Sequence, residues 1–176
     1  MTPLDATRDW LEKAVIGLNL CPFAKAVHLK AQIRWVESTA TDAEALLGDL
    51  VHELRVLASA DPEAIETTIL VHPQALLDFE DYNDFLDIVD AALEELELDG
   101  ELQVASFHPQ YRFEGTDEDD ITNFTNRSPH PTLHLLRESS IERAVASFPD
   151  AAEIFERNQA TLSALGLAGW HALFTR

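Results

Sequence analysis

Residues 67–73 have the sequence TTILVHP, in which five β-branched or aliphatic residues precede a His-Pro pair that contains His72. A short apolar run that stops at proline is typical of a buried strand. Residues 101–109 (ELQVASFHP) repeat this arrangement and contain His108 in the second His-Pro pair. A helical pattern separates the two stretches, and strands joined through a helix are expected to lie parallel, with a right-handed crossover. The sequence therefore predicts an α/β fold in which both histidines leave the sheet at the same edge.

Further elements are predicted on both sides of these two strands. The pattern indicates helices at about 3–19, 41–57 and 81–96, one that begins after Ser139 and one that Asp150 opens and Gly166 ends, and strands at 33–37 and 132–137. Because the last strand follows a loop rather than a helix, it is free to run antiparallel. We expect a single domain over residues 1–176. Its architecture is a mixed sheet of about four strands with two helix crossovers, an N-terminal helix and C-terminal helices.

Three histidines are candidates for a catalytic or metal site. His72 and His108 share the edge at which open α/β sheets bind ligands, and an antiparallel fourth strand would bring His134 to the same place. Three imidazoles suit a zinc or non-haem iron ion with an open coordination position. Two of them suit acid–base catalysis instead, since imidazole titrates near about pH 6.5. The alternative is structural: each His-Pro pair ends a strand with the ring bonded to the backbone, and His134 is a core residue.

The long connection between residues 109 and 131 is typical of a binding loop or lid. It contains two of the few cations of the chain, Arg112 and Arg127, and the polar residues Asn126 and Ser128. A guanidinium group can hold a carboxylate or phosphate through two parallel hydrogen bonds, so we expect a small anionic molecule to bind here. The alternative is that each arginine ties the loop to nearby acids.

Cys21 is the only cysteine, which excludes an internal disulfide and any site built from several cysteines. It follows the first predicted helix and has apolar neighbours, so we expect a buried and inert thiol. Two other roles depend on the geometry of this turn. If the turn folds over the sheet edge, Cys21 becomes a candidate metal ligand or nucleophile beside His72, His108 or His134.

The chain is strongly acidic, with 12 Lys and Arg against 32 Asp and Glu, a formal net charge of −20 with neutral histidines. This charge repels phosphate backbones and anionic lipids, so no nucleic-acid or membrane partner is expected. The N-terminus lacks the basic-then-apolar order of a signal peptide, which favours a cytoplasmic protein. Residues 56–111 contain no Lys or Arg, and acids follow one side of the predicted third helix. This pattern is typical of a solvated face, and it motivates the competing hypothesis of a non-catalytic acidic adaptor with an unknown protein partner or a small-molecule ligand.

Several segments carry a family resemblance that extends over nearly the whole chain. They are residues 17–24 (GLNLCPFA), 82–86 (YNDFL), 103–109 (QVASFHP), 125–129 (TNRSP) and 133–138 (LHLLRE). In these segments the chain resembles a bacterial family, domain of unknown function 1415. The resemblance implies a free-standing bacterial domain and assigns no activity. The leading functional hypothesis, a small enzyme with a histidine-based site and an anionic substrate, therefore depends on the residues themselves.

Overall fold

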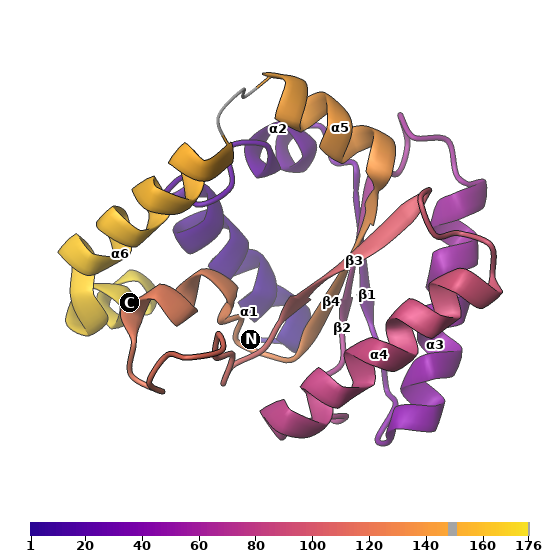
Figure 1. Ribbon diagram of the computed structural model, residues 1–176, viewed down its shortest axis with the longest axis horizontal. Helices are drawn as coiled ribbons and strands as arrows, with labels where there is room; N and C mark the ends of the chain where they lie inside the picture. Colours follow the sequence, from indigo (N-terminus) through magenta and orange to yellow (C-terminus); the bar gives the residue numbers. More distant parts are fainter. Residues whose placement is uncertain (148–150, 176) are drawn as a thin grey trace.

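The computed structural model describes residues 1–147 and 151–175 (Figure 1). The elements are α1 (Pro3–Trp10), the π-helix η1 (Leu11–Ile16), α2 (Ala24–Leu29), β1 (Ile33–Glu37), α3 (Ala43–Ser59), β2 (Thr67–Val71), α4 (Phe79–Glu95), β3 (Leu102–Phe107), the 3₁₀-helix η2 (Ile121–Asn126), β4 (Thr132–Arg137), α5 (Glu138–Ser147) and α6 (Ala151–Phe174). The helix start predicted at Asp150 lies outside the described residues. Gly166, with φ of 69°, interrupts α6 but does not end it, because a further helical segment continues to Phe174.

The sheet has the strand order β1-β2-β4-β3 and confirms the predicted mixed α/β class. β1 and β2 are parallel, and β4 runs antiparallel to both of its neighbours, β2 and β3. The helices α3 and α4 form the two predicted crossovers, whereas β3 and β4 are joined by the loop that contains η2. β2 and β3 therefore point in the same direction, as predicted, but the whole of β4 lies between them. This insertion moves their carboxyl ends apart.

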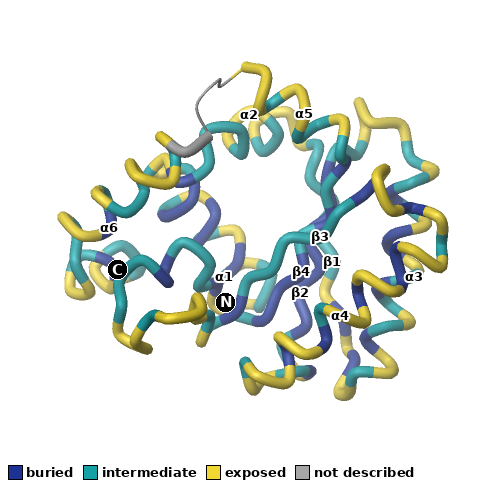
Figure 2. The backbone as a smooth tube through the Cα atoms, in the orientation of Figure 1, coloured by how far each residue is buried: buried dark blue, intermediate teal, exposed yellow. Residues whose placement is uncertain are grey.

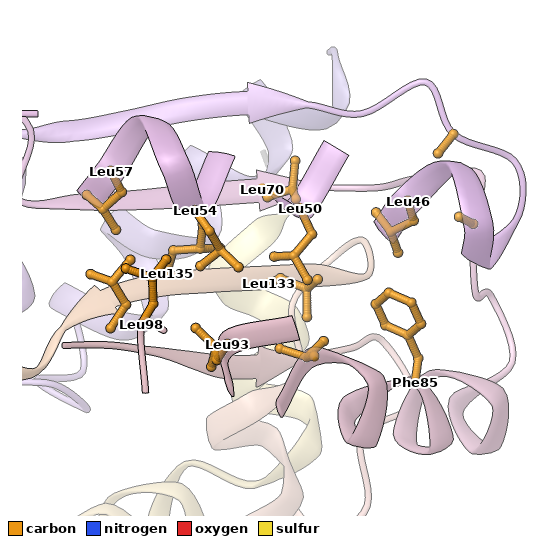
Figure 3. Close-up of a cluster of buried hydrophobic side chains, with 14 of the residues drawn as sticks. Leu46, Leu50, Leu54, Leu57, Leu70, Phe85, Leu93, Leu98, Leu133 and Leu135 are labelled. Carbon is orange, nitrogen blue, oxygen red and sulfur yellow. The ribbon is translucent and has the colours of Figure 1, made fainter. Parts of the chain in front are cut away.

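The face of the sheet toward α3 and α4 carries a leucine-rich core (Figures 2 and 3). The three- and four-residue spacing of the α3 leucines places them on one side of that helix. Leu46, Leu50, Leu54 and Leu57 of α3 pack there with Phe85 and Leu93 of α4 and with Leu70, Leu133 and Leu135 of the sheet.

The opposite face of the sheet is covered by the N-terminal and C-terminal helices (Figure 1). Its core is a separate, more aromatic cluster that includes Trp10, Leu11 and Val15 from the first two helices, Phe124 from η2, and Leu162 and Trp170 from α6. Partly buried side chains complete it, among them Cys21 and Phe107. This second layer, less tightly filled, contains the cavities described below.

The segment before Cys21 departs from the predicted continuous helix. A capping box between Thr2 and Asp5 starts α1 as expected, but from Leu11 the helix widens into π-turns. The amide of Gly17 donates to the Glu12 carbonyl and the amide of Leu20 to the Val15 carbonyl, both over five residues. π-turns inside helices are frequent at functional sites. Here the wide turn, followed by Asn19 at φ of 54°, carries the chain back over the sheet and fixes the position of Cys21.

Gly17→Ala is expected to destabilise this turn, because a Cβ at position 17 would collide with the carbonyl oxygen of Lys13. We expect the free energy of unfolding to fall by about 2 kcal/mol, measured by urea denaturation. The matched control is Gly48→Ala in α3, where a Cβ meets no atom. That change is expected to stabilise the helix by up to about 1 kcal/mol. Equal effects of the two substitutions would contradict the tight packing assigned to Gly17.

Candidate functional site

His72 and His108 lie at the ends of β2 and β3, as predicted, but both side chains are fully buried. Tyr82 of α4 lies between them, with ring centroids 5.8 Å from His72 and 4.9 Å from His108. The backbone fixes both imidazoles: Nδ1 of His72 donates to the Ala75 carbonyl at 2.9 Å, and Nε2 of His108 donates to the Leu76 carbonyl at 3.0 Å. These contacts are those of the structural alternative, in which each His-Pro pair anchors a turn.

The electrostatics of this pair agree with a neutral, structural role. Burial lowers the pKa of His72 to about 4 and also lowers the pKa of His108. His108 accepts a hydrogen bond at Nδ1 from the Gln110 amide, so its neutral ring is satisfied at both nitrogens. A substrate could reach either ring only after the surrounding side chains moved.

His134 does not join the other two histidines. It pairs with Ile69 and Ala105 across β4, between Leu133 and Leu135, whose side chains belong to the leucine-rich core. Because successive residues of a strand point to opposite faces, the His134 ring lies on the other face, against Phe107 at a centroid distance of 6.3 Å. The described part of the chain contains no group of three His, Cys, Asp or Glu side chains able to hold a metal ion. The predicted zinc or iron site of His72, His108 and His134 is therefore not formed.

The polar residues of the predicted binding loop mostly hold the loop itself. Arg127 donates from Nε to the Tyr111 carbonyl at 2.9 Å and from Nη2 to the Glu118 carbonyl at 2.6 Å, and its guanidinium lies over the Phe124 ring. Asn126 donates to the Ser106 carbonyl and Ser128 to the His130 carbonyl, whereas Arg112 is exposed. Arg127 and Ser128 do line a cleft of about 540 Å³, but Asp9 and Asp119 line it too. The four predicted loop residues, Arg112, Asn126, Arg127 and Ser128, thus form no single anion site.

The strongest candidate site is a cavity of about 330 Å³ on the second face of the sheet, which we call the sheet cavity. Its walls come from η1, α2, all four strands and α5, and the residues used below are Cys21, Ala24, Thr67, Ala105, Phe107 and His134. The lining is almost entirely apolar. In the part of the chain that is described, its one charged wall residue is Glu66, which lies 3.7 Å from Arg143 of α5.

A smaller cavity of about 80 Å³, which we call the inner chamber, adjoins the sheet cavity. The two share walls formed by Cys21, Ala24, Phe107 and His134. Trp10 of α1 and Thr132 at the start of β4 complete the inner chamber. The two cavities thus form one continuous site, and the lining of both parts is almost entirely apolar.

Three polar side-chain atoms in these walls are buried without a hydrogen-bond partner: Trp10 Nε1, Thr67 Oγ1 and His134 Nε2. Leaving a buried donor or acceptor unpaired costs roughly 1–3 kcal/mol, so each such atom in a folded protein needs an explanation. The His134 ring is only partly buried because it forms part of the cavity wall, although Nε2 itself is covered. Burial lowers the pKa of His134 to about 4, so its imidazole is neutral near pH 7.

Cys21 occupies the position that would give it a functional role. The expectation of a buried thiol is not met, because Cys21 is partly exposed. The turn after η1 carries it over the sheet into the walls of both cavities, where it faces the same spaces as His134. Hydrogen bonding from Asn158 of α6 to the Leu20 carbonyl, at 2.8 Å, helps to fix this turn. The inert thiol expected from the sequence stays a prediction.

Comparison with known families agrees with the resemblance seen in the sequence. A family model described as Protein of unknown function (DUF1415) matches residues 2–172. The chain belongs to this family. No curated protein and no solved structure matches it. Three of the segments that carry the resemblance, residues 17–24, 103–109 and 133–138, contribute to the walls of the sheet cavity in this DUF1415 protein.

The remaining predictions concern surfaces. The acids of α4 (Asp84, Asp87, Asp90, Glu94 and Glu95) are all exposed, as expected for a solvated face, and the adaptor hypothesis stays a prediction. Among the described helices none is both long and apolar enough to span a bilayer. Sequence reasoning missed Trp10 and Thr67 as parts of a site. Thr67 carried a weak signal, since it places a hydroxyl in a strand predicted to be buried.

Proposed function

We propose that this DUF1415 protein binds a small, neutral and mainly apolar organic molecule in the sheet cavity. The observation that carries the proposal is the unpaired Nε2 of His134 in an otherwise apolar wall. Small-molecule sites are typically concave and apolar, with a few convergent polar groups that fix the orientation of the ligand. A volume of about 330 Å³ falls in the range of such sites.

The charge of the walls argues for a neutral ligand. No lysine or arginine lines the sheet cavity or the inner chamber in the described ranges, and the charged wall residue Glu66 is an acid that is already paired with Arg143. Burying an unpaired anion in apolar surroundings is strongly unfavourable. The anionic substrate predicted from the sequence depended on Arg127, which lines a different cleft. We therefore replace it with a neutral molecule at this site.

His134 is the residue that would act on the bound molecule. A neutral imidazole in a covered site can accept a proton or exchange a hydrogen bond with a ligand, which is the role of a general acid–base group. His72 and His108 are less suited to that role. His72 Nε2 is also buried without a partner, but both rings are fully buried, are bonded to the backbone and lie outside the walls of the sheet cavity. Zinc or iron is not part of this proposal.

The test is a ligand-observed NMR screen with matched pairs of neutral aromatic compounds and their carboxylates. We expect the neutral member of each pair to bind and the carboxylate to bind at least about tenfold more weakly. Ala24→Leu, which fills the wall shared by the two cavities, is expected to abolish binding. The control is Ala26→Leu, at an exposed position of the same helix. Binding that survives Ala24→Leu, or that favours the carboxylates, would overturn the proposal.

A further inference from the structure

β3 forms one edge of the sheet, and the contacts of its neighbours show which of its backbone groups point outward. Successive residues of a strand direct their N–H and C=O groups to alternate sides. The Glu101 carbonyl accepts from the amide of Glu138, which directly follows β4, so the odd-numbered residues of β3 face β4. The Leu102 amide donates instead to the Leu98 carbonyl, in the turn before the strand. The even-numbered residues of β3 therefore direct their backbone groups away from the sheet.

This outer edge is closed at both ends and open in the middle. At one end the Ser106 carbonyl accepts from the Asn126 side chain at 2.9 Å, and the His108 amide donates to the Asn126 carbonyl at 3.0 Å. The turn before the strand closes the other end at the Leu102 amide. Within the described residues, the N–H and C=O of Val104, the Leu102 carbonyl and the Ser106 amide have no hydrogen-bond partner. These groups can make about four hydrogen bonds with an added strand.

The sequence of β3 lacks the features that protect edge strands. Residues 102–107 (LQVASF) contain no charged side chain and no proline, the usual means by which an edge strand avoids pairing with another chain. β1, at the opposite edge of the sheet, carries Arg34 and Glu37. Val104, in the middle of β3, is partly exposed. An uncharged edge with open backbone groups is the kind of surface to which an extended peptide adds as a further strand.

The surface beside this open edge is acidic. α4 packs on β3, and α3 packs against α4 from the side of β1 and β2 (Figure 1). Asn83 of α4 lines a cleft with Tyr111, whose hydroxyl accepts from the side chain of Ser106 in β3, so this side of α4 lies toward the open edge. Asp90 and Glu94, at helical spacing from Asn83, continue the same side, and both are exposed. Since residues 56–111 contain no Lys or Arg, no cation of that segment neutralises these acids.

We propose that the open edge of β3 binds an extended segment of a partner protein that carries lysine or arginine at alternate residues. Leu102 and Val104 place their side chains in the leucine-rich core, on the α4 face of the sheet. Partner residues that pair with them direct their own side chains to the same face, where Asp90 and Glu94 lie. Charge selects this occupant over a second copy of the chain, which has a net charge of −20 and would bring its own α4 acids to the interface. The inference does not depend on the sheet cavity or on the proposed function.

The probes are three blocked heptapeptides: one of alternating lysine and threonine, one with glutamate in place of lysine, and one with N-methylated lysines. Each is titrated at low salt into uniformly ¹⁵N-labelled protein while the backbone amide signals are followed by NMR. We expect the first peptide to bind, to move the Val104 and Ser106 amide signals downfield, and to bind more weakly as salt is added. N-methylation keeps the charge but removes the backbone donors, so that peptide is expected to bind at least about tenfold more weakly. The glutamate peptide is expected not to bind.

Two double variants that remove the same charge locate the site on α4. Asp90→Asn with Glu94→Gln is expected to weaken binding of the lysine peptide about fivefold. Asp81→Asn with Glu95→Gln, exposed positions on a different side of the helix, is the matched control and is expected to leave the affinity unchanged. Equal effects of the two variants, equal binding of the N-methylated peptide, or a Val104 amide that does not move would overturn the proposal. A dimer of the protein alone in which the Val104 amide is protected from hydrogen exchange would also overturn it, because a second copy would then occupy the edge.

Discussion

Tyr82→Phe is expected to lower the free energy of unfolding by about 3 kcal/mol, the cost of leaving buried backbone groups without partners. Tyr82 is fully buried in α4. Its hydroxyl donates to the Thr132 carbonyl at 2.7 Å and accepts from the Phe107 amide at 3.0 Å. Phe107 and Thr132 are paired across β3 and β4, so the hydroxyl bridges the two strands at the edge where His108 follows. Urea denaturation, with the midpoint and slope fitted separately, measures the loss.

The matched control for this prediction is Tyr111→Phe. The Tyr111 hydroxyl accepts a weaker hydrogen bond, at 3.3 Å, from the side chain of Ser106, and Tyr111 is only partly buried. Solvent can replace that bond, so we expect a loss below about 1 kcal/mol. Similar losses for the two variants would mean that Tyr82 does not bridge the strands as described.

The strand and crossover pattern could be predicted from the sequence because it depends on local signals. The apolar runs that end in His72 and His108 marked two strands, and the helical spacing between them marked the crossover. Strand order depends on which edges pair, and neighbouring residues carry no signal for that choice. β4 arrives through a loop and pairs with both β2 and β3, which separates the two histidines. The sequence predicted the common direction of β2 and β3, but it left open which strands are neighbours.

The sheet cavity could not be predicted because it depends on geometry that the sequence hides. The turn at Cys21 combines π-helical bonds with a positive φ at Asn19, and a continuous helix to Asn19 fitted the apolar spacing equally well. The orientation of His134 followed from register: a shift of one residue would have moved its ring into the leucine-rich core. A polar residue on a predicted buried strand was the one usable signal, and it did not reveal which cavity the residue would line.

His134→Leu is expected to stabilise the protein at low pH, because burial holds the His134 imidazole neutral in the folded state. Burial lowers the pKa of His134 to about 4 in the folded state, against about 6.5 in an unfolded chain. Between these values the unfolded state binds the proton more readily, so wild-type stability is fully present above about pH 6.5 and is lost as the pH falls toward 4. The leucine variant has no titrating group at this position, so its stability lacks this contribution to the pH dependence.

The measurement compares wild type and His134→Leu by urea denaturation at pH 7 and pH 5. Relative to the variant, we expect the free energy of unfolding of the wild type to fall by about 2 kcal/mol from pH 7 to pH 5. Taking the difference removes the contributions of His72 and of the many carboxylates, which both proteins share. If the difference in unfolding free energy between the two proteins does not change with pH, His134 is hydrated or paired in solution. That result would contradict the unpaired Nε2.

The contrast with His108→Leu shows why this outcome bears on function. At pH 7 that change removes a bond to the Leu76 carbonyl and one from the Gln110 amide, and we expect a loss of about 2 kcal/mol. Because His134 Nε2 has no hydrogen-bond partner, His134→Leu deprives no other group of a bond to that atom. The change also places apolar carbon in an apolar wall, so it costs little stability at pH 7. A buried polar residue whose removal costs the fold little at pH 7 is a candidate for a role in binding or catalysis, where such a trade-off is expected. The same variant is therefore expected to lose the imidazole-dependent part of ligand recognition while it gains stability in acid.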